Sequence, residues 1–202
     1  MNKTFPKILS ILLHPLLFPS IGMLIIFNSG SILEFLPFQA KKIILLIVSV
    51  STIVLPLTFV PFYIFQKIIK NVQMDHSKER LIPFFVTSVL YTFCYYLLVR
   101  LGAPKTIANF ILVGAVSVFV LFGISFKWKI SAHMVGIGGL TGALIAISFI
   151  LKINLDYYII STVILSGLLG YSRLKLEKHE PYQIYVGWMI GIIISLFILL
   201  LF

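Results

Sequence analysis

Seven stretches of the chain are almost wholly apolar, and short polar segments separate them. A transmembrane helix needs about 20 apolar residues to cross the hydrocarbon core of a bilayer. The pattern predicts spanning helices at Ile8–Phe27, Ile43–Phe65, Leu81–Val99, Ile107–Phe126, Ala132–Leu151, Tyr157–Tyr171 and Tyr185–Phe202. The sixth stretch is short, so the predicted fold class is an all-α polytopic transmembrane bundle with six or seven spans.

The first apolar stretch carries its own interruption. Pro15 and Pro19 lie within it, and His14 precedes the first of them. Proline removes a helical hydrogen bond and clashes with the preceding turn, so a kink is expected here. Elsewhere no linker divides the chain, and we expect a single domain over residues 1–202.

Composition supports membrane insertion and narrows the possible functions. Apolar residues make up 60% of the chain and charged residues 11%, against roughly a quarter in a soluble domain. The mean hydropathy is +1.10. A net charge of +10 is compatible with nucleic-acid binding. Here, however, the cations occupy short loops between spans, which is typical of headgroup contacts, and we expect no nucleic-acid partner.

The richest polar loops share one face of the predicted bundle. They are Gln66–Arg80, Lys127–Lys129 and Ser172–Gln183, and two spans separate each loop from the next. Successive spans alternate between membrane faces, so all three loops open on the same side. Cations from three loops can therefore build one pocket.

Arginine and lysine in these loops suit a phosphate ligand. The planar guanidinium makes two parallel hydrogen bonds to a phosphate, and Arg80 and Arg173 are the candidates. Lys78 would add a point charge. Phosphoryl transfer needs this neutralisation of oxygen charge together with a nucleophile in line with the leaving oxygen.

Two histidines and a serine complete the predicted site. Ser131 precedes the fifth span, where its hydroxyl can cap the helix and reach an anion at the helix N-terminus. His133 then falls in the first turn and can protonate a leaving oxygen. His179 would be the nucleophile that forms a phosphohistidine.

Each of these residues also has a purely structural explanation. Arg80 and Arg173 can anchor helix ends, His133 can bond a backbone carbonyl, and His179 can be a solvated loop residue. Their gathering on one face favours the phosphate site over independent anchors.

The spacing of these residues resembles the type 2 phosphatidic acid phosphatase family. The family signatures are K-x6-R-P, P-S-G-H and S-R-x5-H-x3-D. Ser172 and Arg173 followed by His179 match the third signature, and Ile130-Ser131-Ala132-His133 retains Ser and His of the second. The resemblance covers residues 73–191. It implies phosphate binding by Arg80, Arg173 and Ser131, with His133 as acid and His179 as nucleophile.

Besides Ile130 and Ala132, which replace Pro and Gly of the second signature, the chain departs from the family at three further places. Arg80 is followed by Leu81-Ile82-Pro83, and Gln73 stands where the family has Lys, so Lys78 or Lys70 would have to replace it. Gln183 stands where the family has an Asp that orients the nucleophilic His. Its amide oxygen can accept the same hydrogen bond without supplying charge. The carboxylates that could substitute for this Asp are Glu180, Glu177 and Asp75.

The predicted function is hydrolysis of a phosphomonoester or pyrophosphate on a lipid headgroup. No cofactor or metal is expected, since the six acidic residues show no Mg²⁺-binding spacing and no helix carries an i, i+4 His pair. The expected partners are a phosphorylated lipid and the surrounding membrane lipids. The alternatives are a catalytically impaired protein that binds or moves an anionic lipid, and, with less support, a small-solute transporter.

The expected location is a bacterial inner membrane, and two arguments disagree on the side. Eleven of the sixteen Lys and Arg residues lie on the face with the rich loops. The positive-inside rule places this face in the cytoplasm. The family resemblance implies the outer side instead, but the distribution of Lys and Arg favours the cytoplasmic face.

Overall fold

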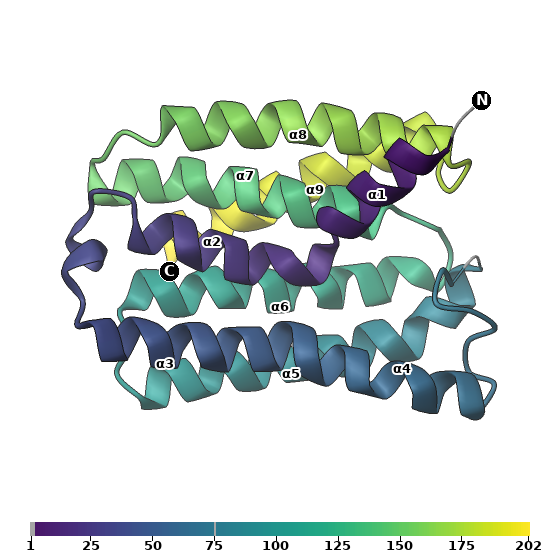
Figure 1. Ribbon diagram of the computed structural model, residues 1–202, viewed down its shortest axis with the longest axis horizontal. Helices are drawn as coiled ribbons and strands as arrows, with labels where there is room; N and C mark the ends of the chain where they lie inside the picture. The colour runs from purple at the N-terminus through teal and green to yellow at the C-terminus, as the bar shows by residue number, and fades with distance from the viewer. Residues whose placement is uncertain (1–2, 75) are drawn as a thin grey trace.

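Long helices packed side by side make up the computed structural model, which describes residues 3–74 and 76–202 (Figure 1). Every regular element in these ranges is helical. Six helical segments there are long and apolar enough to cross a membrane: Thr4–Phe27, Phe38–Phe65, Ser77–Arg100, Lys105–Ser125, Ala132–Leu151 and Pro181–Leu201. The prediction of an all-α polytopic bundle is confirmed, and the chain is a membrane protein.

The first span is broken near its middle, as the prolines predict. Helix α1 (Thr4–Leu12) ends before a 3-10 turn at Pro15–Leu17, and α2 (Phe18–Phe27) continues the span. Proline at residues 15 and 19 cannot donate a backbone hydrogen bond, so the helix cannot run through. The break brings His14 to the inner side of the first span, where it lines a cavity described below.

A second irregularity interrupts the second span. Helix α3 (Phe38–Ser49) passes through a π-helical turn at Val50–Val54 into α4 (Leu55–Phe65). Pro56 lacks the N–H group that the Thr52 carbonyl would otherwise accept, which favours the wider turn. The Tyr91 hydroxyl donates to that carbonyl at 3.4 Å. A buried polar group freed by proline is thus satisfied from a neighbouring helix.

The remaining spans form the other half of the bundle. Helix α5 (Leu81–Arg100), α6 (Lys105–Ser125) and α7 (Ala132–Leu151) begin and end within two residues of the predicted bounds. Helix α9 (Pro181–Leu201) begins four residues earlier than predicted, because Pro181 suits the first helical position.

Glycines bring α7 and α9 into direct backbone contact. A Cβ atom on Gly138 would overlap the Trp188 carbonyl oxygen, and one on Gly191 would overlap the Val135 carbonyl oxygen. Spacing of small residues by four is typical of such close helix pairs in membranes. The contact fixes α9, and hence the loop before it, against the start of α7.

The helix at the sixth predicted span is longer than the apolar stretch Tyr157–Tyr171, but it is not among the six segments apolar enough to cross a membrane. Helix α8 covers Asp156–Lys175 and lies alongside α7 (Figure 1). Arg173 and Lys175 in its last turn lower its hydropathy but interact favourably with the negative end of the helix dipole. The prediction that the polar loop starts at Ser172 is therefore wrong, because Ser172 and Arg173 are helical.

The three polar loops lie at one end of the bundle, together with the start of α1 (Figure 1). Contacts between these segments hold this end together. The Trp128 ring stacks on Tyr182 with centroids 5.7 Å apart, and Lys3 pairs with Glu177 at 2.9 Å. We call this end the cationic end, after the Lys and Arg residues of its loops.

Candidate functional site

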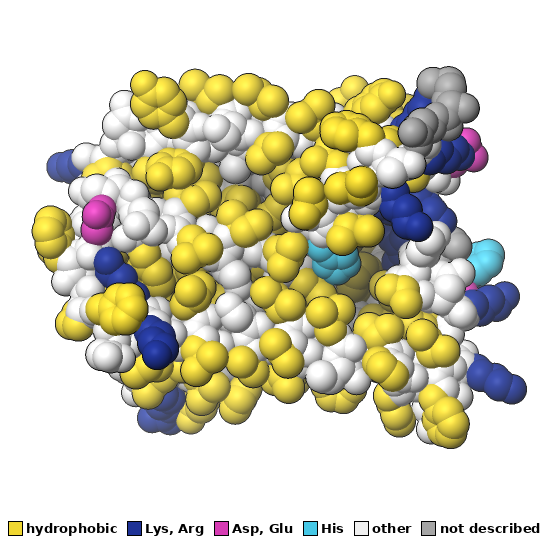
Figure 2. Space-filling view, in the orientation of Figure 1, with side chains coloured by type: hydrophobic (Ala, Val, Ile, Leu, Met, Phe, Trp, Pro, Cys, Tyr) yellow, Lys and Arg dark blue, Asp and Glu magenta, His cyan; other side chains and the backbone are white. Residues whose placement is uncertain are grey.

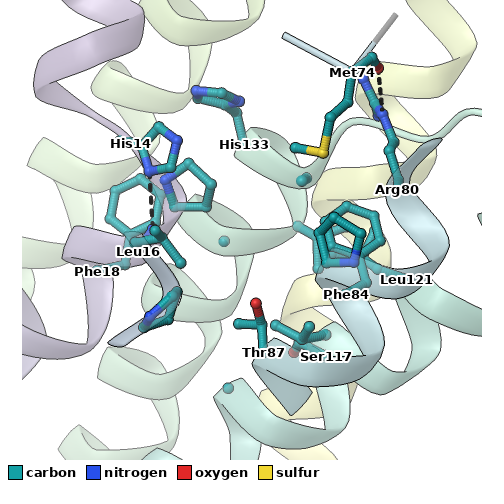
Figure 3. A pocket seen from close by; sticks show the side chains of 18 of the residues that line it. His14, Leu16, Phe18, Met74, Arg80, Phe84, Thr87, Ser117, Leu121 and His133 are labelled. Carbon is teal, nitrogen blue, oxygen red and sulfur yellow. Dashed lines mark hydrogen bonds between the residues drawn. The ribbon is translucent and has the colours of Figure 1, made fainter. Parts of the chain in front are cut away.

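A cavity of about 590 Å³ opens near the cationic end and continues into the bundle. Its polar lining comes from five separate segments of the chain. The His, Lys and Arg residues of this lining are Lys7, His14, Arg80, His133, Arg173, Lys178 and His179. Figure 3 shows His14 and His133 on one side of the cavity and Arg80 on the other. Four of the predicted site residues, Arg80, His133, Arg173 and His179, thus border one space.

His179 is held in one orientation by the residue four positions later. Its Nδ1 atom lies 3.0 Å from Gln183 Oε1, and the backbone N–H of Glu180 donates to the same oxygen at 3.3 Å. A backbone N–H can only donate, so the Gln183 atom must be the carbonyl oxygen. His179 therefore carries its proton on Nδ1, and Nε2 keeps the lone pair.

The local sequence explains this geometry. Glu180 and Gln183 form a reciprocal capping box at the start of α9, in which each side chain accepts from the other residue's backbone N–H. His179 immediately precedes the box, and only 7% of it is exposed. The capping of α9 and the orientation of the imidazole ring are thus produced by the same Gln183 amide.

The surroundings keep the His179 ring neutral. Burial lowers its pKa from 6.5 to about 3, and the positive charges of Arg80, Arg173 and Lys129 act in the same direction. The hydrogen bond with Gln183 opposes this shift but is outweighed. At neutral pH the Nε2 lone pair is therefore available to a nucleophilic reaction.

Arg80 joins two of the cationic loops. Only 6% of it is exposed; its Nε donates to the Met74 carbonyl at 3.0 Å and its Nη1 to the Ile130 carbonyl at 3.1 Å. Ile130 precedes Ser131, whose backbone N–H donates to the Gln183 carbonyl at 3.4 Å. The guanidinium thus belongs to a chain of contacts that ends at the residue orienting His179.

His133 contacts the broken first span. Its Nε2 lies 3.1 Å from the Ser10 carbonyl oxygen, which can only accept, so Nε2 carries a proton. The break leaves that carbonyl without a helical donor. The Leu13 N–H donates to the Leu9 carbonyl and the His14 N–H to the Ile11 carbonyl, so neither bonds the Ser10 carbonyl. The backbone-carbonyl contact considered for His133 from sequence is present, and Nδ1 is the ring atom left for a ligand.

His14 was not predicted as a site residue. Its ring meets the His133 ring edge to face, with centroids 5.5 Å apart, and its Nδ1 accepts from Leu16 N–H at 3.4 Å. A histidine inside a membrane span is costly and favours a functional reading. The sequence contained that signal, but the contact with His133 depends on the kink geometry.

Ser131 and Lys78 do not border the cavity in the described part of the chain. Ser131 is fully buried at the start of α7, but its hydroxyl makes no capping hydrogen bond, contrary to the prediction. The Oγ has no partner among the described residues. Lys78 is exposed in a 3-10 turn at Ser77–Arg80, which directs Arg80 inward and Lys78 to the surface.

The carboxylates considered as substitutes for an Asp are engaged elsewhere. Glu180 caps α9, and Glu177 is exposed and paired with Lys3, whose charge and hydrogen bond lower the pKa of the Glu177 carboxyl. Asp75 lies outside the described residues. The partner of His179 in the structure is the neutral Gln183 amide.

Within residues 3–74 and 76–202, no group of three or more His, Cys, Asp or Glu side chains is arranged to hold a metal ion. Comparison with protein-family models, curated proteins and solved structures finds no match for this chain. The chemistry of the site therefore has to be argued from its own residues. They include the neutral imidazole of His179 with a defined lone pair, two guanidiniums and the imidazoles of His133 and His14 around one cavity.

Proposed function

We propose that this protein is a membrane phosphatase that removes a phosphate from a lipid headgroup through a phosphohistidine at His179. The observation that carries the proposal is the orientation of His179, whose Nδ1–H is bound to Gln183 while the ring borders a cavity shared with Arg80 and Arg173. Phosphate oxygens suit the guanidinium groups, and the Nε2 lone pair suits the phosphorus atom.

In the first step, the His179 Nε2 lone pair forms a bond to phosphorus as the bond from phosphorus to the lipid oxygen breaks. His133 takes up a proton on Nδ1 together with the bound anionic phosphate and passes it to the departing oxygen, while Nε2–H of that ring stays on the Ser10 carbonyl. Arg80 and Arg173 border the transferring group and offset the charge on its oxygens.

In the second step, water attacks the phosphohistidine. His133 now takes a proton from the water as the new phosphorus–oxygen bond forms, and the phosphorus–nitrogen bond breaks. Inorganic phosphate leaves, and the neutral ring of His179 is restored. His133 is thus the general acid of the first step and the general base of the second.

The neutral Gln183 limits the rate of this reaction. Phosphorylation of Nε2 with a proton on Nδ1 leaves a positive ring, which a carboxylate would stabilise and an amide does not. Loss of an analogous Asp in a serine-protease triad lowers the rate by about ten-thousand-fold, although part of that loss reflects a wrong tautomer. Here the amide oxygen preserves the tautomer, so we expect slow but measurable turnover.

Release of phosphate from a panel of phosphorylated lipids, with and without EDTA, tests the proposal. We expect hydrolysis that resists EDTA, is lost in His179→Ala and is retained in His76→Ala. His76 is the matched control because it is exposed in the same group of loops and does not border the cavity. An equal rate in His179→Ala and the unmodified protein would contradict the assignment.

The proposal extends to partners and location. The partner is a phosphorylated lipid presented by the surrounding bilayer, and we place the protein in a bacterial inner membrane. The apolar helices that surround the cavity support a membrane location, and the cations gathered at its end support an anionic lipid partner.

A second candidate function is binding or movement of an anionic lipid without catalysis. It is favoured by the neutral Gln183 and by the two backbone carbonyls that occupy donors of Arg80. Gln183→Asp separates the candidates in an inactive protein. Restored hydrolysis favours the phosphatase, whereas unchanged lipid binding without hydrolysis favours the binding protein.

A further inference from the structure

Beyond its polar lining, the cavity continues as an apolar space that we call the chamber. Its walls come from the first span and from α4, α5, α6 and α7, and Figure 3 shows Phe18, Phe84 and Leu121 lining it. The chamber residues used below are Leu57, Val60, Thr87, Tyr91, Phe110 and Ser117. An anion site alone does not need this volume of hydrocarbon-lined space.

Two helices give the depth of the chamber independently. On α5, Thr87 and Tyr91 follow Arg80 by seven and eleven residues, which at the helical rise corresponds to about 10 and 16 Å. On α6, which runs the other way, Leu121 and Phe110 border the cavity eleven residues apart, again about 16 Å. The hydrocarbon core of a bilayer is about 30 Å thick. The chamber therefore extends from the cationic end to near the middle of the membrane.

The chamber also reaches the lipid-facing surface. Ile11 on α1 and Leu57 on α4 border the cavity, yet 61% and 50% of these side chains are exposed. Residues that both line a cavity and face outward mark an opening between their helices. Figure 2 shows a hollow on this face, with histidine side chains visible among hydrophobic ones.

Two serine hydroxyls in the cavity lack hydrogen-bond partners among the described residues. Ser10 is 7% exposed and Ser117 is 6% exposed, and both border the cavity. Buried hydroxyls are usually satisfied, so the unpartnered Ser10 hydroxyl indicates a polar ligand group, whereas the Ser117 hydroxyl needs a water because a hydrocarbon chain cannot bond to it. Ser10 lies beside His133, where the oxygen that links phosphate to a hydrocarbon chain would be located.

We infer that the chamber holds one hydrocarbon chain of the phosphorylated lipid, which enters from the bilayer between α1 and α4. This inference rests on the proposed function, because it assigns a place to the hydrocarbon part of the proposed substrate. The chamber takes a single chain, and any second chain remains in the bilayer outside the opening. Chain occupancy of the chamber, not headgroup recognition alone, then selects the substrate.

A filling mutation tests this assignment. Thr87→Phe adds a ring inside the chamber, whereas Val89→Phe adds one on the lipid-facing side of the same helix, where Val89 is 51% exposed. The probes are hexadecyl phosphate and butyl phosphate, offered to the full chain in lipid nanodiscs. Rates are compared as variant over unmodified protein, which cancels partitioning of the long chain into lipid.

We expect Thr87→Phe to lower kcat/KM for hexadecyl phosphate at least tenfold and to leave butyl phosphate within twofold. Val89→Phe should leave both within twofold. Ser117→Leu is a smaller filling change and provides a second variant if Thr87→Phe does not fold. Equal losses for both probes, or equal effects of Thr87→Phe and Val89→Phe, would overturn the inference.

Binding separates this inference from the proposed function. If the unmodified protein hydrolyses neither probe, binding is measured in place of the hydrolysis rate, by displacement of labelled hexadecyl phosphate with unlabelled hexadecyl phosphate. Weaker binding in Thr87→Phe but not Val89→Phe then supports the chamber while the phosphatase proposal fails. Hydrolysis that is unchanged in Thr87→Phe would support the phosphatase proposal and overturn the assignment of the chamber.

Discussion

The Nδ1 atom of His179 donates a hydrogen bond of 3.0 Å to the side-chain oxygen of Gln183. The same oxygen accepts the Glu180 backbone N–H, so the amide cannot rotate without losing the cap of α9. A helix-capping residue thereby determines which nitrogen of the imidazole carries the lone pair. The nucleophile of the proposed reaction is defined by this contact.

Supplying a charge at residue 183 should accelerate the reaction. Gln183→Glu keeps the length of the side chain and replaces a neutral acceptor by a carboxylate, which stabilises the positive phosphohistidine ring. We expect kcat for a lipid phosphate to rise at least tenfold. The acid limb of the pH–rate profile should also shift to higher pH, because a carboxylate raises the pKa of His179 from about 3.

Rate profiles of the two proteins between pH 3 and pH 8 check this prediction. Gln183→Leu is the control, since it removes the acceptor and should lower the rate. A Glu variant slower than the Leu variant would show that residue 183 does not act on His179.

Protonation of His179 should couple folding stability to pH. The ring is neutral in the fold down to about pH 3, whereas in the unfolded chain it binds a proton below about pH 6.5. The unfolded state thus binds more protons between these values, and stability falls as the pH falls. For this one group the loss approaches about 1.4 kcal/mol per pH unit below 6.5.

Thermal unfolding in detergent at pH 7 and pH 5 measures this coupling. His179→Gln should reduce the drop in Tm between the two pH values, and His76→Gln, at an exposed residue that does not border the cavity, is the control. An identical drop in all three proteins would contradict the buried neutral ring.

The role proposed for His133 depends on the leaving group. Alkyl phosphates need a proton on the departing oxygen, whereas p-nitrophenol leaves without one. His133→Asn should therefore lower kcat for an alkyl phosphate by about 10²–10⁴-fold while p-nitrophenyl phosphate loses much less in the phosphorylation step. Burst kinetics with both substrates measure this. Equal losses for the two leaving groups would instead assign His133 a structural role on the Ser10 carbonyl.

The close contact of α7 with α9 should tolerate no added methyl group. Gly191→Ala places a Cβ against the Val135 carbonyl and Gly139 N–H, and neither backbone atom can move away. We expect a loss of about 1–3 kcal/mol, the usual cost of overpacking. Gly167→Ala on α8 is the matched control, since no atom lies within 4 Å of its added Cβ. Thermal unfolding that ranks the two variants equally would contradict the packing.

Much of the fold could be predicted from apolar periodicity alone. The bounds of α7 were predicted to the residue, because an apolar stretch begins directly after Ser131 and ends before Lys152. The prediction for α8 was too short because Arg173 and Lys175 in its last turn resemble loop residues by hydropathy. Terminal charges of this kind stabilise a helix end, and a hydropathy window counts them against it.

The site could be predicted only in part, and the reason lies in tertiary structure. Alternation of spans between faces brought Arg80, His133, Arg173 and His179 to one end, and all four border the cavity. The contact of His133 with the Ser10 carbonyl and the His14 ring follows from the kink in the first span, whose direction no local pattern specifies. Lys78 was predicted to support the phosphate, but the 3-10 turn at Ser77–Arg80 directs Arg80 inward and leaves Lys78 exposed.

The sequence at residues 180–183 contains the pattern of the capping box at the start of α9. An acceptor at the residue before Pro181 and Gln three positions later is a helix-start pattern. Read in this way, the pattern predicts that the Gln183 oxygen faces back toward His179. A local capping rule would thus have predicted the tautomer of the proposed nucleophile.

Trapping the covalent intermediate tests the central claim most directly. The purified protein is mixed with a ³²P-labelled lipid phosphate, quenched in alkali within one turnover, and digested for peptide mapping. We predict a label that is stable in alkali, labile in acid and located on His179. A label on another residue, a label that persists in His179→Ala, or hydrolysis without any labelled protein would contradict the account.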